Sequence, residues 1–327
     1  MKILIVHYHS FELWHAPSWI RERLQQEFPQ HQFVQLQNDD RVPEEITDTD
    51  VFIGSSLRPQ HFITAKKLRW IHSPAAAVHQ LMYPELLQSG VVLTNSTGIH
   101  GPVVAEHAIA VLLAMAKRLP QAMQYQAKHE WSQDQLWHGR PRPREVADAT
   151  VAVIGMGGIG REFTTRAKAF GMKILAVRET PGKGLGGADA VYGSAQIEEV
   201  LPQSDYVLLC TPVTPATTGI INAARLRKMK PDAYLINVAR GPLIDEAALI
   251  AALRERRIAG AALDVFMEEP LPPDSPFWSL DNVLVTPHTA AVTDRLWERH
   301  YLHIAENLQR FLHGQPLLNQ VDKNRGY

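Results

Sequence analysis

The stretch VAVIGMGGIG, Val151–Gly160, places a glycine-rich turn directly after a short apolar run. Its spaced glycines have the G-x-G-x-x-G pattern, which between a strand and a helix binds the pyrophosphate of a dinucleotide. The first glycine permits the tight turn, the second lets the backbone approach the phosphates, and the third lets the helix pack on the strand. A tight turn without a ligand is the alternative. The predicted cofactor-binding residues of this turn are Gly155, Gly157, Gly158, Ile159 and Gly160.

Short apolar runs alternate with amphipathic segments on both sides of this turn, which is typical of buried parallel strands separated by helices. Strands are predicted at residues 3–6, 32–36, 51–53, 68–71 and 91–93, then at 151–154, 173–177, 206–210, 233–238, 260–265 and 283–285. Helices are predicted at residues 18–28, 103–117, 159–170 and 294–313, and Asn222 and Asp245 are predicted to cap two more. The two successive arrays predict an α/β protein with two doubly wound, Rossmann-like domains.

The alternation lapses between residues 120 and 149, and no strand or helix is predicted there. Prolines make the run Arg140–Arg144 an extended, solvated connector. Trp131 and Trp137 lie in the same region. We interpret them as buried packing residues, with an active-site mouth or a subunit contact as the alternatives.

The bulk composition argues against several classes of protein. A net charge of -1 gives no basic surface for nucleic acid. No apolar run approaches the roughly 20 residues that span a bilayer, and residues 1–6 are interpreted as a strand rather than a signal segment. The single cysteine, Cys210, cannot form an intrachain disulfide, which indicates a cytoplasmic setting, and we expect it to pack near the cofactor. No histidine or cysteine pattern has metal-ligand spacing, so no metal is expected.

The strand after the glycine turn ends at the position that distinguishes NAD from NADP. Proteins that bind NAD place an acid there, about 20 residues after the glycines, on the ribose 2′-hydroxyl. Here the strand ends with Arg178, and the acid, Glu179, comes one residue later. A guanidinium suits a 2′-phosphate, helped by Thr180 and Lys183, so NADP(H) is favoured over NAD(H). Stacking of Arg178 on adenine, or its exposure to water, is the alternative.

Four further motifs accompany the glycine turn along the chain. They are residues 98–107, GIHGPVVAEH; residues 237–241, NVARG; residues 263–270, LDVFMEEP; and residues 286–290, TPHTA. Together with the turn, these motifs resemble, in order and spacing, those of the D-2-hydroxyacid dehydrogenase family, which includes glyoxylate/hydroxypyruvate reductases and phosphoglycerate dehydrogenases. The resemblance covers nearly the whole chain. It implies an oxidoreductase that transfers a hydride between NAD(P)H and C2 of a 2-keto acid, giving a D-2-hydroxy acid.

The resemblance also implies an architecture. An NAD(P)-binding domain of residues 100–288 would be inserted into a flavodoxin-like substrate domain formed by residues 1–99 and 289–327. Members of the family are usually homodimers built around a helix like the one predicted at residues 103–117. The implied partner of the protein is a small 2-keto or 2-hydroxy acid, with no nucleic acid and no membrane.

The family's catalytic residues correspond to a histidine, a glutamate and an arginine of this chain. Reduction of a ketone puts negative charge on its oxygen, so an acid must donate a proton, and histidine can do this near neutral pH. By resemblance, His288 is this donor, Glu269 holds its ring, and Arg240 binds the substrate carboxylate and polarises the carbonyl. Taken singly, each could be an ordinary surface residue, but their joint occurrence favours a site. The other residues implied in cofactor binding are Thr211, Pro212, Val238, Ala239 and Asp264, the last near the nicotinamide carboxamide.

A loop in the first domain, residues 73–79, resembles the family's substrate-carboxylate loop. There the backbone N–H groups of two successive small residues meet the carboxylate, and these correspond to Ala76 and Ala77. The family usually has glycine at the position of Ala77 and often an acid at that of His79. An ordinary loop is the alternative.

Three other classes of protein share parts of this pattern. Formate dehydrogenases of the same family carry glutamine at the position of Glu269, and formate oxidation needs no proton donor, so the acid argues against them. L-lactate-type dehydrogenases begin with their glycine turn, whereas here a complete α/β array precedes it. A dinucleotide-sensing corepressor of the same fold stays open, and turnover with 2-keto acids distinguishes it from an enzyme.

Overall fold

The computed structural model of the chain describes residues 1–76, 78–182 and 184–324. It divides the chain into two compact units, Met1–His100 with Val292–Tyr327 (unit 1) and Gly101–Ala291 (unit 2). These boundaries lie one and three residues beyond the predicted ones. The shifts have local causes, because a helix begins at Gly101, and because the N–H groups of Thr289 and Ala290 donate to Asp264 inside unit 2.

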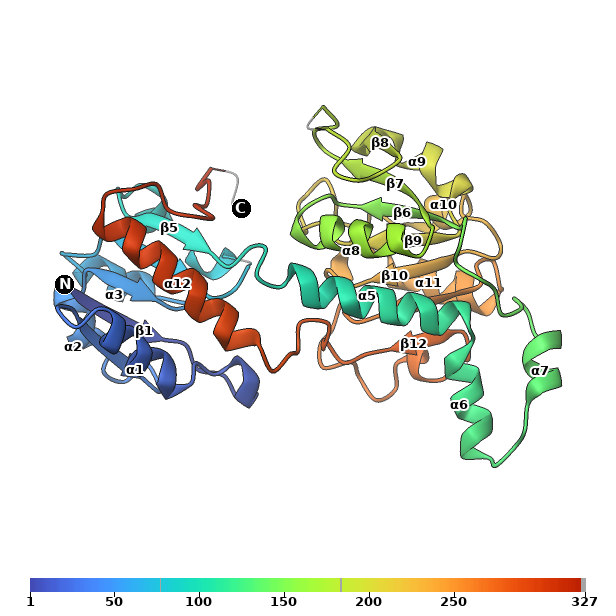
Figure 1. The fold of residues 1–327 in the computed structure, drawn as a ribbon, viewed down its shortest axis with the longest axis horizontal. Helices are drawn as coiled ribbons and strands as arrows, with labels where there is room; N and C mark the ends of the chain where they lie inside the picture. The colour runs from blue at the N-terminus through green and yellow to red at the C-terminus, as the bar shows by residue number, and fades with distance from the viewer. Residues whose placement is uncertain (77, 183, 325–327) are drawn as a thin grey trace. The chain divides into compact units, whose positions relative to one another are not determined.

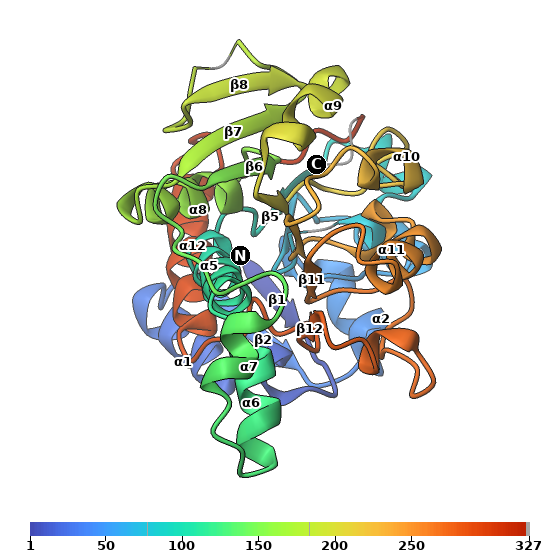
Figure 2. The same cartoon turned by 90° about the vertical axis from the view of Figure 1, so that its right-hand side faces the viewer.

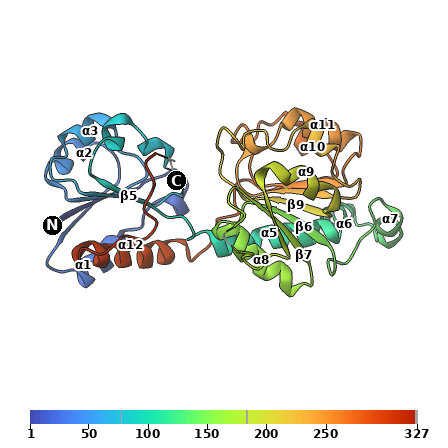
Figure 3. The same cartoon turned by 90° about the horizontal axis from the view of Figure 1, so that it is seen from above.

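Unit 1 is built on a parallel sheet with the order β2-β1-β3-β4-β5. This is the flavodoxin-like order expected for the first domain. The strands are β1 (Lys2–Val6), β2 (Gln32–Leu36), β3 (Val51–Ile53), β4 (Trp70–Ser73) and β5 (Val92–Asn95). The helices are α1 (Ser18–Glu27), α2 (Val42–Glu45), α3 (Pro59–Thr64), α4 (Pro84–Leu87) and α12 (Leu296–Leu312). Helices α1 and α12 cover one face of the sheet, and α2 and α3 lie on the other (Figures 1 and 3).

Unit 2 is built on a second parallel sheet, with the order β12-β11-β10-β9-β6-β7-β8. The strands are β6 (Thr150–Ile154), β7 (Lys173–Arg178), β8 (Ala190–Gly193), β9 (Tyr206–Leu209), β10 (Tyr234–Asn237), β11 (Gly260–Leu263) and β12 (Val283–Val285). The helices are α5 (Gly101–Ala116), α6 (Leu119–Ala127), α7 (Gln133–His138), α8 (Gly158–Ala169), α9 (Ile197–Val200), α10 (Ala223–Leu226) and α11 (Glu246–Arg254). The first strand, β6, lies between β7 and β9, so the connections leave it in opposite directions. That is the Rossmann arrangement, with a ligand crevice expected where the strand order reverses.

Helices bury both faces of the unit 2 sheet. Helices α5 and α8 pack side by side on one face, and α10 and α11 lie on the other (Figure 3). Because both faces are covered, the strands are continuous apolar runs without alternation, which is why the sequence predicts them well. The predicted caps are confirmed, since the side chains of Asn222 and Asp245 accept from the third backbone N–H of α10 and α11. Within the described residues, no helix combines the length and the apolar character that crossing a membrane requires.

Three predictions for unit 2 were wrong. Helices α6 and α7 occupy the region where no helix was predicted, and they project from the layered part of the unit (Figures 1 and 2). Neither helix has a buried residue. Leu119, Ala122 and Met123 of α6 have helical spacing but are exposed or half-buried. Trp131 and Trp137, predicted to be buried, are 91% and 53% exposed. The half-buried edge strand β8 was also missed.

The connector Arg140–Arg144 has no helix or strand, as predicted, but it is not simply solvated. The guanidinium of Arg144 donates to the hydroxyl of Tyr206 (3.1 Å) and to the carbonyl of Asp232 (2.8 Å). It also lies over the rings of Tyr206 and Tyr234. The connector is therefore fastened to the amino-terminal ends of β9 and β10.

Candidate active site

The predicted site residues of unit 2 follow consecutive strands at one edge of the sheet. Because all strands are parallel, their carboxyl ends meet at the same edge. Along the order β12, β11, β10, β9, β6 and β7, these ends carry His288, Asp264, Arg240, Thr211, the glycine turn and Arg178. Residues more than 130 positions apart in the sequence are thus brought to one row, which the strand order alone determines.

The glycine turn links β6 to α8 and has the geometry that a bound pyrophosphate needs. Gly155 has a φ of +110°, and a Cβ there would lie 2.7 Å from the carbonyl oxygen of Cys210. A Cβ on Gly160 would lie 2.1 Å from the carbonyl oxygen of Gly155, so the helix packs closely against the turn. At Gly157, which caps α8, a Cβ would meet nothing within 4 Å. The first and last glycines are therefore required by the chain itself, whereas the middle one leaves open space at a helix N-terminus, where phosphate binds favourably. Between Gly157 and Gly160, Gly158 and Ile159 are half-buried in the first turn of α8.

Cys210 contacts the glycine turn through its side chain. Its buried thiol donates to the carbonyl of Gly155 (2.9 Å), and burial raises the pKa of the thiol to about 12. A thiol this difficult to ionise is a packing group rather than a nucleophile. Thr211 and Pro212 follow it at the sheet edge, where the Pro212 carbonyl accepts from the hydroxyl of Thr217 (2.7 Å).

Arg178 is the last residue of β7, where the sequence placed the ribose-sensing side chain. Its Nη2 donates to the carbonyl of Pro181 (3.0 Å) and to that of Gly184, within the loop that follows the strand. Its Nε is buried and meets no acceptor among the residues that the structure describes. Thr180 is exposed on the same loop, and Lys183 lies outside the described residues.

His288 and Glu269 form a pair at the β11–β12 side of the edge. Nδ1 of His288 lies 2.6 Å from Oε2 of Glu269, and each side chain is about one-third exposed, at 33% and 34%. The other carboxylate oxygen, Oε1, accepts from the backbone N–H of Phe266 (2.9 Å), which fixes the direction of the carboxylate. A carboxylate can only accept, so Nδ1 carries the proton of this hydrogen bond. The ring is thereby oriented with its Nε2 edge turned away from Glu269.

Asp264, predicted to lie near the cofactor, is buried after β11 with 2% exposure and holds the loop that bears His288. Its Oδ1 accepts from the Thr286 hydroxyl (2.6 Å) and from the N–H of Thr289 (2.9 Å), and its Oδ2 accepts from the N–H of Ala290 (3.0 Å). Its backbone carbonyl accepts from the N–H of His288 (2.9 Å). This structural task of Asp264 and Thr286 was not predicted from the sequence. A hydroxyl residue directly after a strand, close to the predicted proton donor, was the available signal.

Arg240 lies on the turn after β10 and is exposed at the sheet edge. Its Nη1 donates to the carbonyl of Ala239 (2.6 Å), beside the buried Val238 and Ala239. Asn237, which was not predicted as a site residue, shapes this turn, because its side chain accepts from the N–H of Ala239 (3.1 Å) and donates to the carbonyl of Arg240 (2.9 Å). The structure thus pairs His288 with Glu269 and places Arg240 on the neighbouring strand end.

In unit 1, Ala76 is exposed on the loop after β4, and Ala77 lies outside the described residues. The buried side-chain amide of Asn95, at the end of β5, donates to the carbonyl of Ala76 (2.9 Å). This bond ties the predicted substrate loop to the neighbouring strand end.

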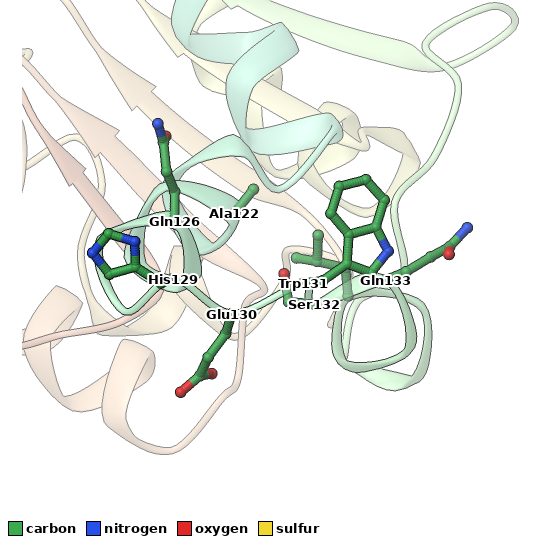
Figure 4. Close-up of a pocket in the computed structure, with 8 residues that line it drawn as sticks. Ala122, Gln126, His129, Glu130, Trp131, Ser132 and Gln133 are labelled. Atoms are coloured by element: carbon green, nitrogen blue, oxygen red, sulfur yellow. The ribbon is translucent and has the colours of Figure 1, made fainter.

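A hollow of about 610 Å³ lies elsewhere in unit 2, between α6 and α7 (Figure 4). Its lining residues are Ala122, Gln126, His129, Glu130, Trp131, Ser132, Gln133 and Leu136. The glycine turn lies at the other end of α5, whose 16 residues span about 24 Å. The hollow is therefore separate from the sheet edge. Among the described residues, no group of three or more His, Cys, Asp or Glu is arranged to hold a metal ion.

Comparison with known proteins shows the family. The family described as "D-isomer specific 2-hydroxyacid dehydrogenase, NAD binding domain" matches residues 109–290. A glyoxylate reductase of Korarchaeum cryptofilum is 34% identical over 318 residues, which cover 93% of this chain and 94% of the relative. The chain belongs to the D-isomer specific 2-hydroxyacid dehydrogenase family, and it is an oxidoreductase that uses NAD(P).

Solved structures agree with this assignment over the whole chain. A D-isomer specific 2-hydroxyacid dehydrogenase from Xanthobacter autotrophicus Py2, in complex with NADPH and MES, is 32% identical with a TM-score of 0.83, covering 99% of each chain. An NADPH-dependent glyoxylate/hydroxypyruvate reductase from Sinorhizobium meliloti, in complex with NADP and sulfate, is 26% identical with a TM-score of 0.82, covering 100% of each chain. The predicted α/β class with two Rossmann-like domains is confirmed.

Proposed function

We propose that this enzyme reduces a small 2-keto acid to the D-2-hydroxy acid, with His288 as the proton donor. The observation that carries the proposal is the 2.6 Å contact between His288 Nδ1 and Glu269 Oε2, on a strand end in the same row as the glycine turn. A carboxylate-oriented imidazole is suited to proton transfer near neutral pH.

The residues have separate tasks in this mechanism. Arg240 binds the substrate carboxylate, for which its planar fork of donors is suited, and draws electron density from the adjacent carbonyl. The nicotinamide, when bound, supplies the hydride that reduces C2. The carbonyl oxygen then takes the proton from Nε2 of His288, which leaves a neutral ring whose Nδ1–H still donates to Glu269. The backbone at Ala76 and Ala77 is the second element proposed to bind the substrate carboxylate.

The open space at Gly157 and the strand-end row fit a dinucleotide. Gly155 to Gly160 would hold the pyrophosphate, and the residues after β9, β10 and β11, including Thr211, Pro212, Val238, Ala239 and Asp264, would line the path to the nicotinamide.

We propose NADP(H) as the preferred cofactor. The Nε of Arg178 is buried and has no acceptor among the described residues, at the strand end where the ribose 2′ group is expected to bind, and Thr180 follows on the same loop. Both solved relatives named above were obtained with NADP or NADPH. The test compares kcat/KM with NADPH and with NADH for the native enzyme and for Arg178→Ala. A charge-assisted bond contributes about 1.5–3 kcal/mol, so the variant should lose about 10- to 150-fold with NADPH and little with NADH. An equal loss with both cofactors would contradict the assignment.

The reaction is tested with a panel of glyoxylate, hydroxypyruvate, pyruvate, phenylpyruvate and a branched 2-keto acid, each with NADPH and NADH. Glyoxylate or hydroxypyruvate is expected to be reduced fastest, because the relatives named above reduce these acids by name. His288→Gln should lower kcat by about 10²- to 10⁴-fold while NADPH binding, measured by fluorescence, persists. Arg240→Ala should raise KM and lower kcat together. Reduction of none of the acids, with cofactor bound, would favour a dinucleotide-sensing binding protein.

We further propose that two copies associate through α5 and the projecting α6–α7 segment, in the cytoplasm. The segment exposes Leu119, Met123, Trp131 and Trp137. Four large apolar side chains on one projecting segment favour an interface with a partner that buries them. Light scattering after gel filtration should give a dimer for the native chain and a monomer for Trp131→Glu. Ile63→Glu, at an exposed apolar position on α3 of unit 1, is the matched control and should stay dimeric. A native monomer at micromolar concentration would contradict the proposal.

A further inference from the structure

We propose that His107 and Thr286 are positioning residues for His288, which they hold through the buried carboxylate of Asp264. The proposal rests on the proposed function, because it concerns the residue to which proton transfer is assigned. Neither His107 nor Thr286 is among the residues predicted from the sequence to act in the site.

The three side chains come from three elements and meet inside unit 2. His107 lies on α5, Asp264 follows β11, and Thr286 follows β12. Nε2 of His107 lies 3.2 Å from the Thr286 hydroxyl oxygen and 3.6 Å from Oδ1 of Asp264. The Thr286 hydroxyl lies 2.6 Å from the same Oδ1. The side chain of His107 is 19% exposed, and that of Asp264 is 2% exposed, so water competes little with these contacts.

The donors and acceptors of this network can be ordered. Asp264, as a carboxylate, can only accept, so the single hydroxyl proton of Thr286 is given to its Oδ1. The hydroxyl oxygen of Thr286 is then left to accept, and the donor is the Nε2–H of His107. Burial lowers the pKa of His107, and the Asp264 carboxylate raises it in partial compensation. A neutral ring with its proton on Nε2 satisfies this chain of hydrogen bonds, in which each bond polarises the next.

The network acts on the loop that carries His288. Asp264 also accepts from the N–H groups of Thr289 and Ala290, and its backbone carbonyl accepts from the N–H of His288. His288 itself has a φ of +52°, a left-handed conformation that a non-glycine residue adopts only when its surroundings hold it there. Loss of the Thr286 or His107 contact leaves Asp264 freer to turn, and the loop and the His288 ring move with it. A displacement of about 1 Å at a reacting group costs about 100-fold in rate.

The experiment uses two pairs of substitutions in the full-length enzyme. Thr286→Val keeps the branched shape and removes the hydroxyl, whereas Thr286→Ser keeps the hydroxyl. His107→Leu removes the donor, whereas His107→Gln retains an N–H near the same place. Ser204→Ala is the matched control, because it deletes a buried hydroxyl bond (2.8 Å, to the carbonyl of Val200) at the opposite, amino-terminal edge of the same sheet.

We expect Thr286→Val and His107→Leu each to lower kcat by about 10- to 100-fold, with KM for the keto acid changed less than threefold. The solvent deuterium isotope effect on kcat should rise, because proton transfer becomes slower. The serine, glutamine and Ser204→Ala variants should retain kcat within about threefold. The double variant should lose little more than the worse single one, because both act through one network.

Amide hydrogen exchange of residues 286–291 gives a readout that does not depend on turnover. Exchange there should accelerate in Thr286→Val and not in Ser204→Ala. If exchange accelerates but no keto acid is reduced even by the native enzyme, the proposed function fails while the network stands. Native kcat and an unchanged isotope effect in both Thr286→Val and His107→Leu would overturn the positioning proposal. So would a loss confined to NADPH affinity, which would place the network at the cofactor instead.

Discussion

Acidification is expected to destabilise unit 1 through histidines that are buried or half-buried and have no carboxylate partner among the described residues. His300, on α12, is 3% exposed, and its Nδ1 lies 3.3 Å from the Ser96 hydroxyl. Burial, with smaller contributions from His100, His7 and His303, lowers the pKa of His300 to about 3. Burial, together with His9 and His15, lowers the pKa of His7 to about 4.

The sign and size of the effect follow from these values. The folded state keeps both rings largely neutral at pH 5, whereas the unfolded chain takes up protons below the ordinary histidine pKa of 6.5. Stability contributed by the neutral rings is therefore complete above about pH 6.5 and is lost as the pH falls toward the folded values. Between pH 7.5 and pH 5, each histidine should lower the free energy of unfolding by about 2 kcal/mol, from 1.5 pH units at 1.36 kcal/mol per unit.

Hydrogen exchange of α12 peptides in increasing urea measures the unfolding of unit 1 separately from unit 2. In the native chain, the free energy obtained at pH 5 should be at least about 4 kcal/mol below that at pH 7.5, because burial also lowers the pKa of the fully buried His72 well below its ordinary value and adds to the effect of His7 and His300. His300→Gln, which can still bond to Ser96, should reduce the difference by about 2 kcal/mol. His313→Gln, which replaces an exposed histidine just after the same helix, is the matched control. The reasoning is refuted if His300→Gln retains the full difference.

Three further predictions concern unit 2. Glu269→Gln removes the charge that holds His288. Because the pair is one-third exposed, the loss should lie at the low end of the range for a hydrogen bond to a charged group, so kcat/KM should fall about tenfold. A native kcat/KM in steady-state assays would contradict this. Gly241→Ala would place a Cβ 2.0 Å from the carbonyl carbon of Phe266, so it should lower the midpoint of thermal unfolding by several degrees and shift the Arg240 turn, with kcat reduced at least about tenfold. An unchanged midpoint would show that the backbone accommodates the methyl group. Asp245→Ala removes the cap of α11 and should cost about 1 kcal/mol in urea unfolding, whereas Asp245→Asn should restore most of it.

The sequence predicted the parts of the fold that are buried on both sides. Strand β3, buried throughout, was predicted at its observed bounds, and the largely buried β6 and β9 were predicted within one residue, because covered parallel strands are short apolar runs between turns. Helix α6 and strand β8 bury little, and both were missed. An element that buries little need not carry an apolar period, so its position is determined by contacts that a local pattern does not contain.

The sequence predicted which residues form the candidate site but not the contacts that hold them. Motif spacing placed Glu269 and His288 on successive strand ends, yet nothing local shows that Oε1 of Glu269 is held by the N–H of Phe266. The support from His107 depends on the packing of α5 against the sheet, since His107 lies 157 residues before Asp264 and 179 residues before Thr286 in the chain. Such contacts arise from tertiary packing, so a sequence pattern alone does not reveal them.

The backbone of His288 shows how the stability of the fold supports the proposed chemistry. A left-handed non-glycine residue costs about 1–3 kcal/mol. Four hydrogen bonds from residues 286–290 to Asp264 oppose that cost, each worth about 1 kcal/mol net. Their sum exceeds the strain, so the loop keeps one shape in the absence of any ligand. A proton donor already in place needs no rearrangement when charge develops on the substrate oxygen. The proposed proton transfer therefore depends on the hydrogen bonds between residues 286–290 and Asp264 as well as on the imidazole of His288.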